Sequence, residues 1–117
     1  ARYVRPPQGY EDIMEGKKSP ASGRVYTLQY TTPHLIHRCH SVYDNTSMLM
    51  DTTPHGVMIN PQDAAQRNIQ DGEKVYVYND MGCTKLKAIV TKAQPKGVVS
   101  ITQGAWYQPS KDETYEA

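Results

Sequence analysis

Residues 75–90 read VYVYNDMGCTKLKAIV, and this stretch decides the fold class. Between residues 75 and 78 small aliphatic and aromatic side chains alternate. In the second run Leu86, Ala88 and Val90 alternate with Lys85, Lys87 and Ile89. Alternation with a period of two is typical of β-strands. Residues 79–82, Asn-Asp-Met-Gly, lie between the two runs and are of the types that turns require. The stretch therefore predicts an antiparallel hairpin.

Shorter apolar runs flank this hairpin on both sides. Val57-Met58-Ile59 leads directly into Asn60-Pro61-Gln62-Asp63, where the asparagine can cap a helix, the proline can take its first position and the aspartate suits its dipole. We therefore expect a strand at 57–59 and a helix from Pro61 to about Asn68. The β-branched and aromatic run Val25 to Tyr30 predicts a first strand, and Val98 to Ile101 predicts the last one.

The remaining stretches are polar and mark the limits of the domain. Residues 34–51 predict a long loop with one short helix. Residues 1–24, in which proline and glycine recur, predict a mostly irregular lead-in segment, and residues 110–117 a loose tail. A length of 117 residues fits one domain. Short strands separated by turns every ten residues or so favour a mainly β fold, a small closed β-barrel, over a helical or parallel α/β domain.

Composition excludes several classes of function. Thirteen lysines and arginines against 12 aspartates and glutamates give a formal net charge of +1, too little for nucleic acid to be an expected partner. No apolar stretch approaches the roughly 20 residues that span a bilayer, so we expect no direct membrane insertion. Hydrophobic residues make up 38% of the chain, which predicts a small core. Cys39 and Cys83 match no redox or metal spacing, and we expect two unpaired thiols.

An ordered set of short motifs resembles the dinucleotide-binding domain of the molybdopterin oxidoreductases, in particular the dimethyl sulfoxide reductase family. Each motif is weak alone, but order and spacing agree from about residue 25 to residue 109. The motifs are Leu28-Gln29, Thr32-Pro33-His34, Arg38, His40-Ser41, Asp44-Asn45, Ile59-Asn60-Pro61, Asp63-Ala64, Ile69, Asp71-Gly72, Val75 to Asn79, Gly82 and Gln103-Gly104-Ala105-Trp106-Tyr107.

The resemblance implies a fold and a cofactor. The expected fold is a double-psi β-barrel of the aspartate decarboxylase-like type, with one or two short helices, over residues 25–109. In the resembled family this domain covers a molybdenum cofactor with a pair of molybdopterin guanine dinucleotides, which it contacts through its loops, while the metal's protein ligand lies in another domain. The chain is thus expected to be the C-terminal cofactor-binding domain of a larger enzyme, and to hold no catalytic and no metal-ligating residue itself.

The same resemblance, together with side-chain chemistry, nominates the cofactor-binding residues. Arg38 can donate a bidentate fork to a phosphate, and imidazole, hydroxyl and amide groups can hydrogen-bond a polar heterocycle. Glycines let the backbone approach a ligand closely. Trp106 is expected either to wall the site or to pack against the missing domains. The nominated residues are Thr32, His34, Arg38, His40, Ser41, Asn45, Asn79, Gln103, Gly104 and Trp106.

Plainer interpretations stand beside these. Arg38 could be a solvated surface charge, and Asn79 with Gly82 could serve the turn alone. Asn60 and Asp63 are explained by helix capping. Tyr76 and Tyr78 share one face of a strand and are expected to pack on the barrel exterior rather than to form a stacking platform.

A metal site at three neighbouring histidines is a further alternative. His34, His37 and His40 are spaced three residues apart with Cys39 among them, and this spacing would align metal ligands on a helix. Pro33 and the strand before it favour a loop instead, so we do not expect a metal here.

The function expected for this domain is that of one part of a larger enzyme. We expect the parent to be a molybdenum oxidoreductase of anaerobic respiration that transfers an oxygen atom, with dimethyl sulfoxide favoured over other S- or N-oxides and oxyanions. Its expected partners are the remaining domains of the catalytic subunit and, through the parent, iron-sulfur and membrane-anchor subunits. Localisation cannot be read from the fragment itself, and the parent is expected to be exported or bound to the outer face of a bacterial cytoplasmic membrane.

Two alternatives use the same barrel. A pyruvoyl-dependent decarboxylase generates its cofactor at a Gly-Ser bond, and the sequence contains no Gly-Ser dipeptide. A non-enzymatic protein-binding module remains open. No Ser-His-Asp set, metal cluster or phosphate-binding loop with recognisable spacing is present, so turnover by this domain alone is not expected.

Overall fold

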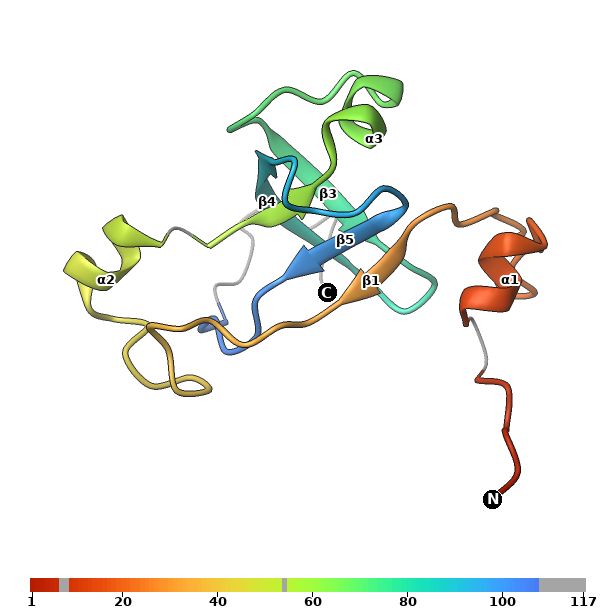
Figure 1. Ribbon diagram of the computed structural model, residues 1–117, viewed down its shortest axis with the longest axis horizontal. Helices are drawn as coiled ribbons and strands as arrows, with labels where there is room; N and C mark the ends of the chain where they lie inside the picture. Colours follow the sequence, from red (N-terminus) through yellow and green to blue (C-terminus); the bar gives the residue numbers. More distant parts are fainter. Residues whose placement is uncertain (7–8, 54, 108–117) are drawn as a thin grey trace.

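A computed structural model describes residues 1–6, 9–53 and 55–107. Within them the chain forms a five-stranded sheet accompanied by three short helices (Figure 1). The mainly β architecture expected from the sequence is confirmed. The elements in chain order are α1 Tyr10–Met14, β1 Gln29–Thr31, α2 Ser47–Thr52, β2 Val57–Ile59, α3 Pro61–Gln66, β3 Lys74–Tyr78, β4 Cys83–Val90 and β5 Val98–Ile101.

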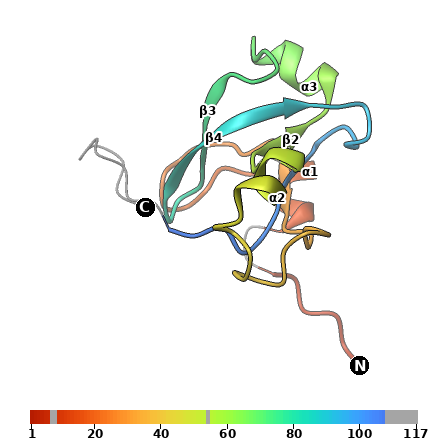
Figure 2. The same ribbon diagram turned by 90° about the vertical axis from the view of Figure 1, so that its left-hand side faces the viewer.

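The sheet is mixed, with the strand order β1-β5-β2-β4-β3. β1 runs parallel to β5 and β2 runs parallel to β4, whereas β2/β5 and β3/β4 are antiparallel pairs. The strands curl about a common interior rather than lying flat (Figures 1 and 2). β1 and β3 are the edge strands of this order, so the crossings that define a closed double-psi barrel stay a prediction.

The hairpin that anchors the sequence argument is confirmed. β3 pairs with β4 from Lys74 opposite Lys87 to Tyr78 opposite Cys83. The side chain of Asn79 shapes the turn, because its Oδ1 accepts hydrogen bonds from the backbone N–H groups of Met81 (2.8 Å) and Gly82 (3.1 Å). The turn explanation for Asn79 is therefore sufficient in this structure.

The core is small, as the composition predicts. Its buried apolar side chains come from β2, α3, β4 and β5, and no large side chain is fully buried among the described residues. Partly buried residues of β3, β4 and the stretch before β1 pack around it. The buried core cluster consists of Val57, Ile59, Ala64, Val99 and Ile101.

α3 begins as its sequence predicts. Asn60 Oδ1 accepts from the backbone N–H of Gln62 at 2.9 Å, and Pro61 occupies the first helical position. Asp63 has a tertiary role beyond the dipole, because it is buried and its Oδ2 accepts from the backbone N–H of Gly97 at 2.6 Å. The helix ends at Gln66, slightly short of the expected Asn68, which adopts φ of +54°.

The prediction for the first strand was wrong in its bounds. The run 25–30 is not one strand: β1 begins only at Gln29, and Val25 forms an isolated bridge with Lys18. The reason is tertiary, since side chains of residues 19–26 are held by the β3–β4 turn. Tyr26 and Ser22 donate to Asp80 Oδ1 at 2.6 Å each, and Ser19 also donates to this carboxylate.

The lead-in segment also contains more order than expected. It carries α1, a third helix where the sequence predicted one or two in all, and its Arg5 pairs with Asp12 at 2.6 Å. The expected loop with one short helix is confirmed by α2. Cys39 and Cys83 are unpaired, as predicted. The expected tail, 110–117, lies outside the described residues.

Candidate functional site

Two loops meet at one edge of the sheet, and most of the nominated residues lie on them. β1 and β5 are parallel, so their carboxyl ends lie at the same edge, and the segments that follow them leave the sheet side by side (Figure 1). We call residues 33–44 the histidine loop and residues 102–106 the glutamine loop. The backbone N–H of Gln103 donates to the carbonyl of Pro33 at 3.2 Å, which joins the loops where they begin.

The first cluster consists of His34, His40 and Gln103. Gln103 Nε2 lies 3.0 Å from His34 Nδ1 and 3.4 Å from His40 Nδ1. The two imidazole rings contact each other edge to face, with centroids 5.6 Å apart. Both histidines are exposed and Gln103 is half-buried, so the cluster presents ring and amide groups to the outside. We name these three residues the His–Gln cluster.

Beneath this surface lies a buried ion pair. Arg38 Nη2 donates to Asp44 Oδ1, and Arg38 Nη1 donates to the backbone carbonyl of Gln103 at 3.1 Å. The side chains are only 4% and 7% exposed. A solvated Arg38 is therefore wrong, because the guanidinium is enclosed by the two loops.

Asp44 and Trp106 complete the contacts. The other oxygen of Asp44 accepts from the backbone N–H of Trp106 at 2.6 Å, and the indole N–H of Trp106 donates to the carbonyl of Ser41 at 2.7 Å. Gly104 allows the close approach: its φ is +89°, and a Cβ there would lie 1.7 Å from the His40 carbonyl oxygen. Trp106, half exposed, thus packs on the histidine loop within this chain.

His55 supports the loops from the sheet side. Its Nδ1 lies 3.2 Å from Thr102 Oγ1, and Thr102 is buried at the start of the glutamine loop. Burial lowers the pKa of His55 below its ordinary value, and the positive charge of Arg38 lowers this pKa further, although Asp44 opposes the change. His55 is thus electrostatically coupled to the Arg38–Asp44 pair.

The structure does not bring all nominated residues together. Asn79 lies in the β3–β4 turn and takes no part in these contacts. Thr32 and Asn45 are exposed at the ends of the histidine loop. The residues that the loops do join are His34, Arg38, His40, Ser41, Gln103, Gly104 and Trp106.

Sequence reasoning missed the roles of three residues. Asp44 stood in a quoted motif but was not nominated, although it is the only acidic residue between residues 28 and 50, where Arg38 is the only lysine or arginine. His55 and Thr102 lie in no motif, and only the fold brings them to the loops.

The three neighbouring histidines are not equivalent in the structure. His37 lies apart from the His–Gln cluster, in a shallow depression that Arg38, Cys39 and Leu49 also line. Within residues 1–6, 9–53 and 55–107, no three His, Cys, Asp or Glu side chains are grouped so as to hold a metal ion. In the same residues, no helix has the length and apolar character needed to cross a membrane.

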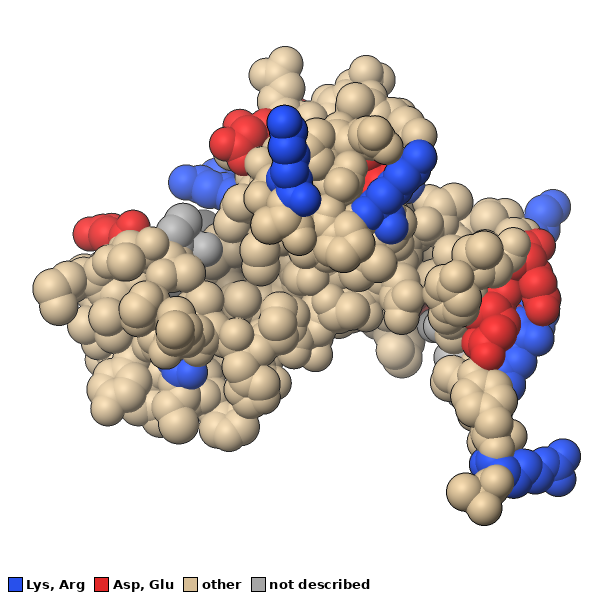
Figure 3. All heavy atoms as spheres, viewed as in Figure 1, with Lys and Arg blue, Asp and Glu red and all other residues tan. Residues whose placement is uncertain are grey.

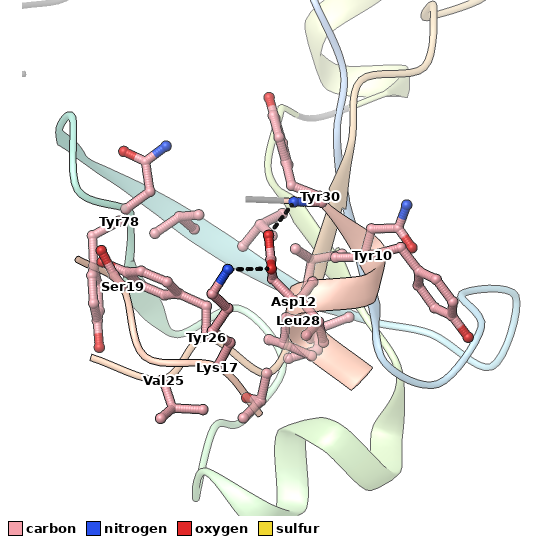
Figure 4. A pocket seen from close by; sticks show the side chains of 18 of the residues that line it. Tyr10, Asp12, Lys17, Ser19, Val25, Tyr26, Leu28, Tyr30 and Tyr78 are labelled. Atoms are coloured by element: carbon pink, nitrogen blue, oxygen red, sulfur yellow. Dashed lines mark hydrogen bonds and ion pairs between the residues drawn. The ribbon is translucent and has the colours of Figure 1, made fainter. Parts of the chain in front are cut away.

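A larger cavity lies elsewhere, between the lead-in segment and the concave face of the sheet (Figure 4). Its volume is about 950 Å³, and tyrosine and aliphatic side chains dominate its lining. One pair of opposite charges lies in its lining, where Lys17 Nζ is 3.4 Å from Asp12 Oδ1. Of the nominated residues only Asn79 lines it. We therefore place the candidate site at the two loops, where polar groups converge.

Surface charge separates the two ends of the molecule. Acidic and basic side chains gather at α1, whereas few charged atoms appear over α2 and the loop before it (Figure 3). From residue 28 to residue 50 the only charged residues are Arg38 and Asp44, which are buried against each other. Within residues 28–50 of the described chain, the region around the His–Gln cluster thus offers hydrogen-bonding groups without a free lysine, arginine or carboxylate.

Comparisons with known proteins confirm the family that the motifs resemble. The sequence model of a family described as the molydopterin dinucleotide binding domain matches residues 28–115. The chain is 42% identical over 100 residues to dimethyl sulfoxide reductase DmsA of Escherichia coli strain K12, covering 86% of this chain and 12% of that protein. It is 40% identical over 89 residues to the trimethylamine-N-oxide reductase of Haemophilus influenzae, covering 72% of this chain and 10% of the relative.

A solved structure shows the same fold. Acetylene hydratase from Pelobacter acetylenicus superposes with a TM-score of 0.63 at 23% identity, over 77% of this chain and 13% of the other. The chain matches about a tenth to an eighth of the length of these relatives.

Proposed function

Because this chain belongs to the molydopterin dinucleotide binding domain family, we propose that its two loops form the cofactor-contacting surface of a larger molybdenum oxidoreductase. Membership supports a molybdopterin cofactor. The proposal adds that the cofactor is the guanine dinucleotide form, present as a pair on one molybdenum, and that this domain covers it. The observation that carries the proposal is the His–Gln cluster, which lies at the carboxyl edge of the parallel strands β1 and β5.

The hydrogen-bonding groups of the His–Gln cluster fit the heterocyclic part of such a cofactor better than its phosphate part. Imidazole nitrogens and a carboxamide can donate to and accept from the polar edge of a pterin or guanine ring. The two rings of His34 and His40 add an aromatic surface. The loops present no exposed lysine or arginine that could neutralise a diphosphate. We propose that this surface recognises the heterocyclic part, and that most phosphate contacts come from the rest of the parent.

In this proposal the residues of the two loops bind the cofactor and shield it from water. When bound, the molybdenum cofactor supplies oxygen-atom transfer coupled to two electrons. His34, His40 and Gln103 orient the ring system, while Trp106 and the packed glutamine loop exclude water from one side of it. Exposed Ser41, Asn45 and Thr32 are proposed as further polar contacts at the rim.

The parent's activity is proposed from its relatives. Two relatives carry the names dimethyl sulfoxide reductase and trimethylamine-N-oxide reductase. We propose that the parent reduces an S- or N-oxide in bacterial anaerobic respiration, with dimethyl sulfoxide favoured. Its proposed partners are the other domains of the subunit and, through them, iron-sulfur and membrane-anchor subunits at the outer face of the cytoplasmic membrane. None of the described contacts favours the alternative of a non-enzymatic protein-binding module.

Calorimetric titration of the 117-residue chain tests the proposal. The probes are extracted molybdopterin guanine dinucleotide, guanosine, GDP and pyrophosphate. We expect binding of the extracted dinucleotide, comparable affinities for guanosine and GDP, and no competition by pyrophosphate.

Two histidine variants locate the site. His34→Ala should weaken binding of the extracted dinucleotide about tenfold, the loss expected for a hydrogen bond of roughly 1–1.5 kcal/mol. His37→Ala is the matched control, because this exposed histidine lies on the same loop but apart from the cluster. Equal losses of affinity in both variants, or no binding of the extracted dinucleotide by the unsubstituted 117-residue chain, would overturn the proposal.

A further inference from the structure

The Arg38–Asp44 pair is enclosed to a degree that a ligand-binding pair does not need. The two side chains are 4% and 7% exposed, whereas the ion pair of Arg5 with Asp12 is 41% and 18% exposed. Removing two charges from water is costly, and a buried pair persists only when its remaining donors and acceptors are also satisfied. Here they are satisfied by the backbone of the neighbouring loop.

The pair links the two loops through two hydrogen bonds, in addition to the bond between Arg38 and Asp44 themselves. Asp44 uses one oxygen for Arg38 and the other for the backbone N–H of Trp106 at 2.6 Å. Arg38 reaches the carbonyl of Gln103 at 3.1 Å. Both residues of the pair belong to the histidine loop, and both backbone partners belong to the glutamine loop. The pair is therefore a cross-link between the loops.

This cross-link determines where the His–Gln cluster can form. Gln103 meets His34 and His40 only because the glutamine loop lies directly against the histidine loop. The two loop backbones approach each other most tightly at Gly104, where a Cβ would overlap the His40 carbonyl. The indole N–H of Trp106, bonded to Ser41, and the Gln103 N–H, bonded to Pro33, also join the loops, but among these contacts only those of Arg38 and Asp44 involve buried charges.

We propose that Arg38 and Asp44 are a positioning pair, which sets the spacing of His34, His40 and Gln103, and that Arg38 does not bind a phosphate group. The inference rests on the proposed function in one respect, since it assumes that the His–Gln cluster receives the ligand. The alternative role of Arg38 as a phosphate ligand needs two free N–H groups on one edge of the guanidinium. In the structure Nη1 and Nη2 each already donate one N–H within the protein, and the side chain is only 4% exposed, so its remaining N–H groups are enclosed by the loops.

Trp106 provides a direct reporter, because it is the only tryptophan in the chain. Its backbone N–H bonds to Asp44 and its indole N–H bonds to Ser41, so both groups are visible in one nitrogen-edited NMR spectrum. We expect Asp44→Asn to shift both resonances and to speed amide exchange of Trp106 about tenfold or more, as expected for loss of a charge-assisted hydrogen bond. Asp51→Asn, an exposed aspartate on α2, is the matched control and should leave both unchanged.

A double-mutant cycle separates positioning from phosphate binding. Arg38→Gln, Asp44→Asn and the double variant are compared by Trp106 exchange and by affinity for extracted molybdopterin guanine dinucleotide. A positioning pair predicts strongly non-additive effects on both, with the double variant no worse than the poorer single variant. Unchanged resonances of the β3–β4 hairpin verify that each variant is folded, and the double variant, which buries no lone charge, keeps the test open if a single variant unfolds.

The outcomes distinguish this inference from the proposed function. If Trp106 in Asp44→Asn behaves as it does in Asp51→Asn, the positioning role is overturned whatever the ligand results are. If Arg38→Gln weakens binding additively with Asp44→Asn, Arg38 contacts the ligand and the inference is equally overturned. If the unsubstituted chain binds no dinucleotide while the Trp106 effects follow the cycle, the cross-link stands and the proposed function alone fails.

Discussion

Replacing Gly104 by alanine should open the candidate site, and the structure allows the cost to be worked out against a matched control. Gly104 and Gly97 both have positive φ, +89° and +79°, so an alanine at either position is strained by about 1–2 kcal/mol. The two positions differ in the room available for a Cβ atom. A Cβ at Gly97 meets nothing within 4 Å, whereas a Cβ at Gly104 would lie 1.7 Å from the His40 carbonyl oxygen and 2.4 Å from its carbon.

That overlap involves backbone atoms, so no flexible side chain can relieve it. Forced overpacking costs roughly 1–3 kcal/mol beyond the strain, which gives a total of about 2–5 kcal/mol for Gly104→Ala against about 1–2 kcal/mol for Gly97→Ala. The cheapest relief is separation of the two loops, which would break the bonds from Trp106 to Asp44 and Ser41.

The assay combines urea unfolding followed by circular dichroism with Trp106 fluorescence under native conditions. Gly104→Ala should shift the tryptophan emission to longer wavelength as the indole leaves Ser41, and Gly97→Ala should not. Equal losses of stability in the two variants, with unchanged tryptophan emission in both, would refute the claim that the loops are packed backbone to backbone at Gly104.

Three further perturbations probe the fold around the site. Asn60→Ala should lower the free energy of unfolding by about 1–2 kcal/mol in urea denaturation, because it removes the α3 cap and the 2.8 Å bond from Asn60 Nδ2 to the Gln94 carbonyl. Since the folded-state pKa of His55 lies below its ordinary value of 6.5, stability should be full above that pH and fall as the pH drops below it, and His55→Gln should flatten this dependence in thermal unfolding between about pH 7.5 and 5. Asp80→Asn should release residues 19–26, so that trypsin cleaves after Arg24 faster than in the unsubstituted chain.

Each of these has a result that contradicts it. A loss below about 0.3 kcal/mol for Asn60→Ala, equal to that of the exposed Gln62→Ala, would remove the capping argument. A pH dependence that His55→Gln leaves intact would mean that another group titrates. Unchanged cleavage in Asp80→Asn would show that the lead-in segment is held by other contacts.

Local sequence signals predicted the hairpin and the start of α3, whereas long-range contacts determined where the first strand begins. The hairpin at 75–90 and the start of α3 were predictable because turn chemistry and capping act within a few residues. The first strand was not, because Tyr26 is bound by Asp80, which lies 54 residues further along the chain. The hydrophobic pattern of residues 25–30 contains no information about a partner as distant as Asp80.

The candidate site shows the same division. The motifs predicted that the histidine and glutamine loops carry the site, and parallel pairing of β1 with β5 explains why the two loops meet. Side-chain chemistry alone suggested a phosphate role for Arg38, since a free guanidinium suits that ligand. Burial against Asp44 depends on the register of two loops more than 60 residues apart, and only the fold discloses it.

The central claim is that the His–Gln cluster receives a molybdopterin dinucleotide, and the most direct test is a two-dimensional NMR titration of the labelled chain with extracted molybdopterin guanine dinucleotide. The account predicts saturable amide shifts confined to the histidine and glutamine loops, with the Asn79 turn and the cavity beside α1 unaffected. Shifts centred on that cavity, or none at all, would contradict it.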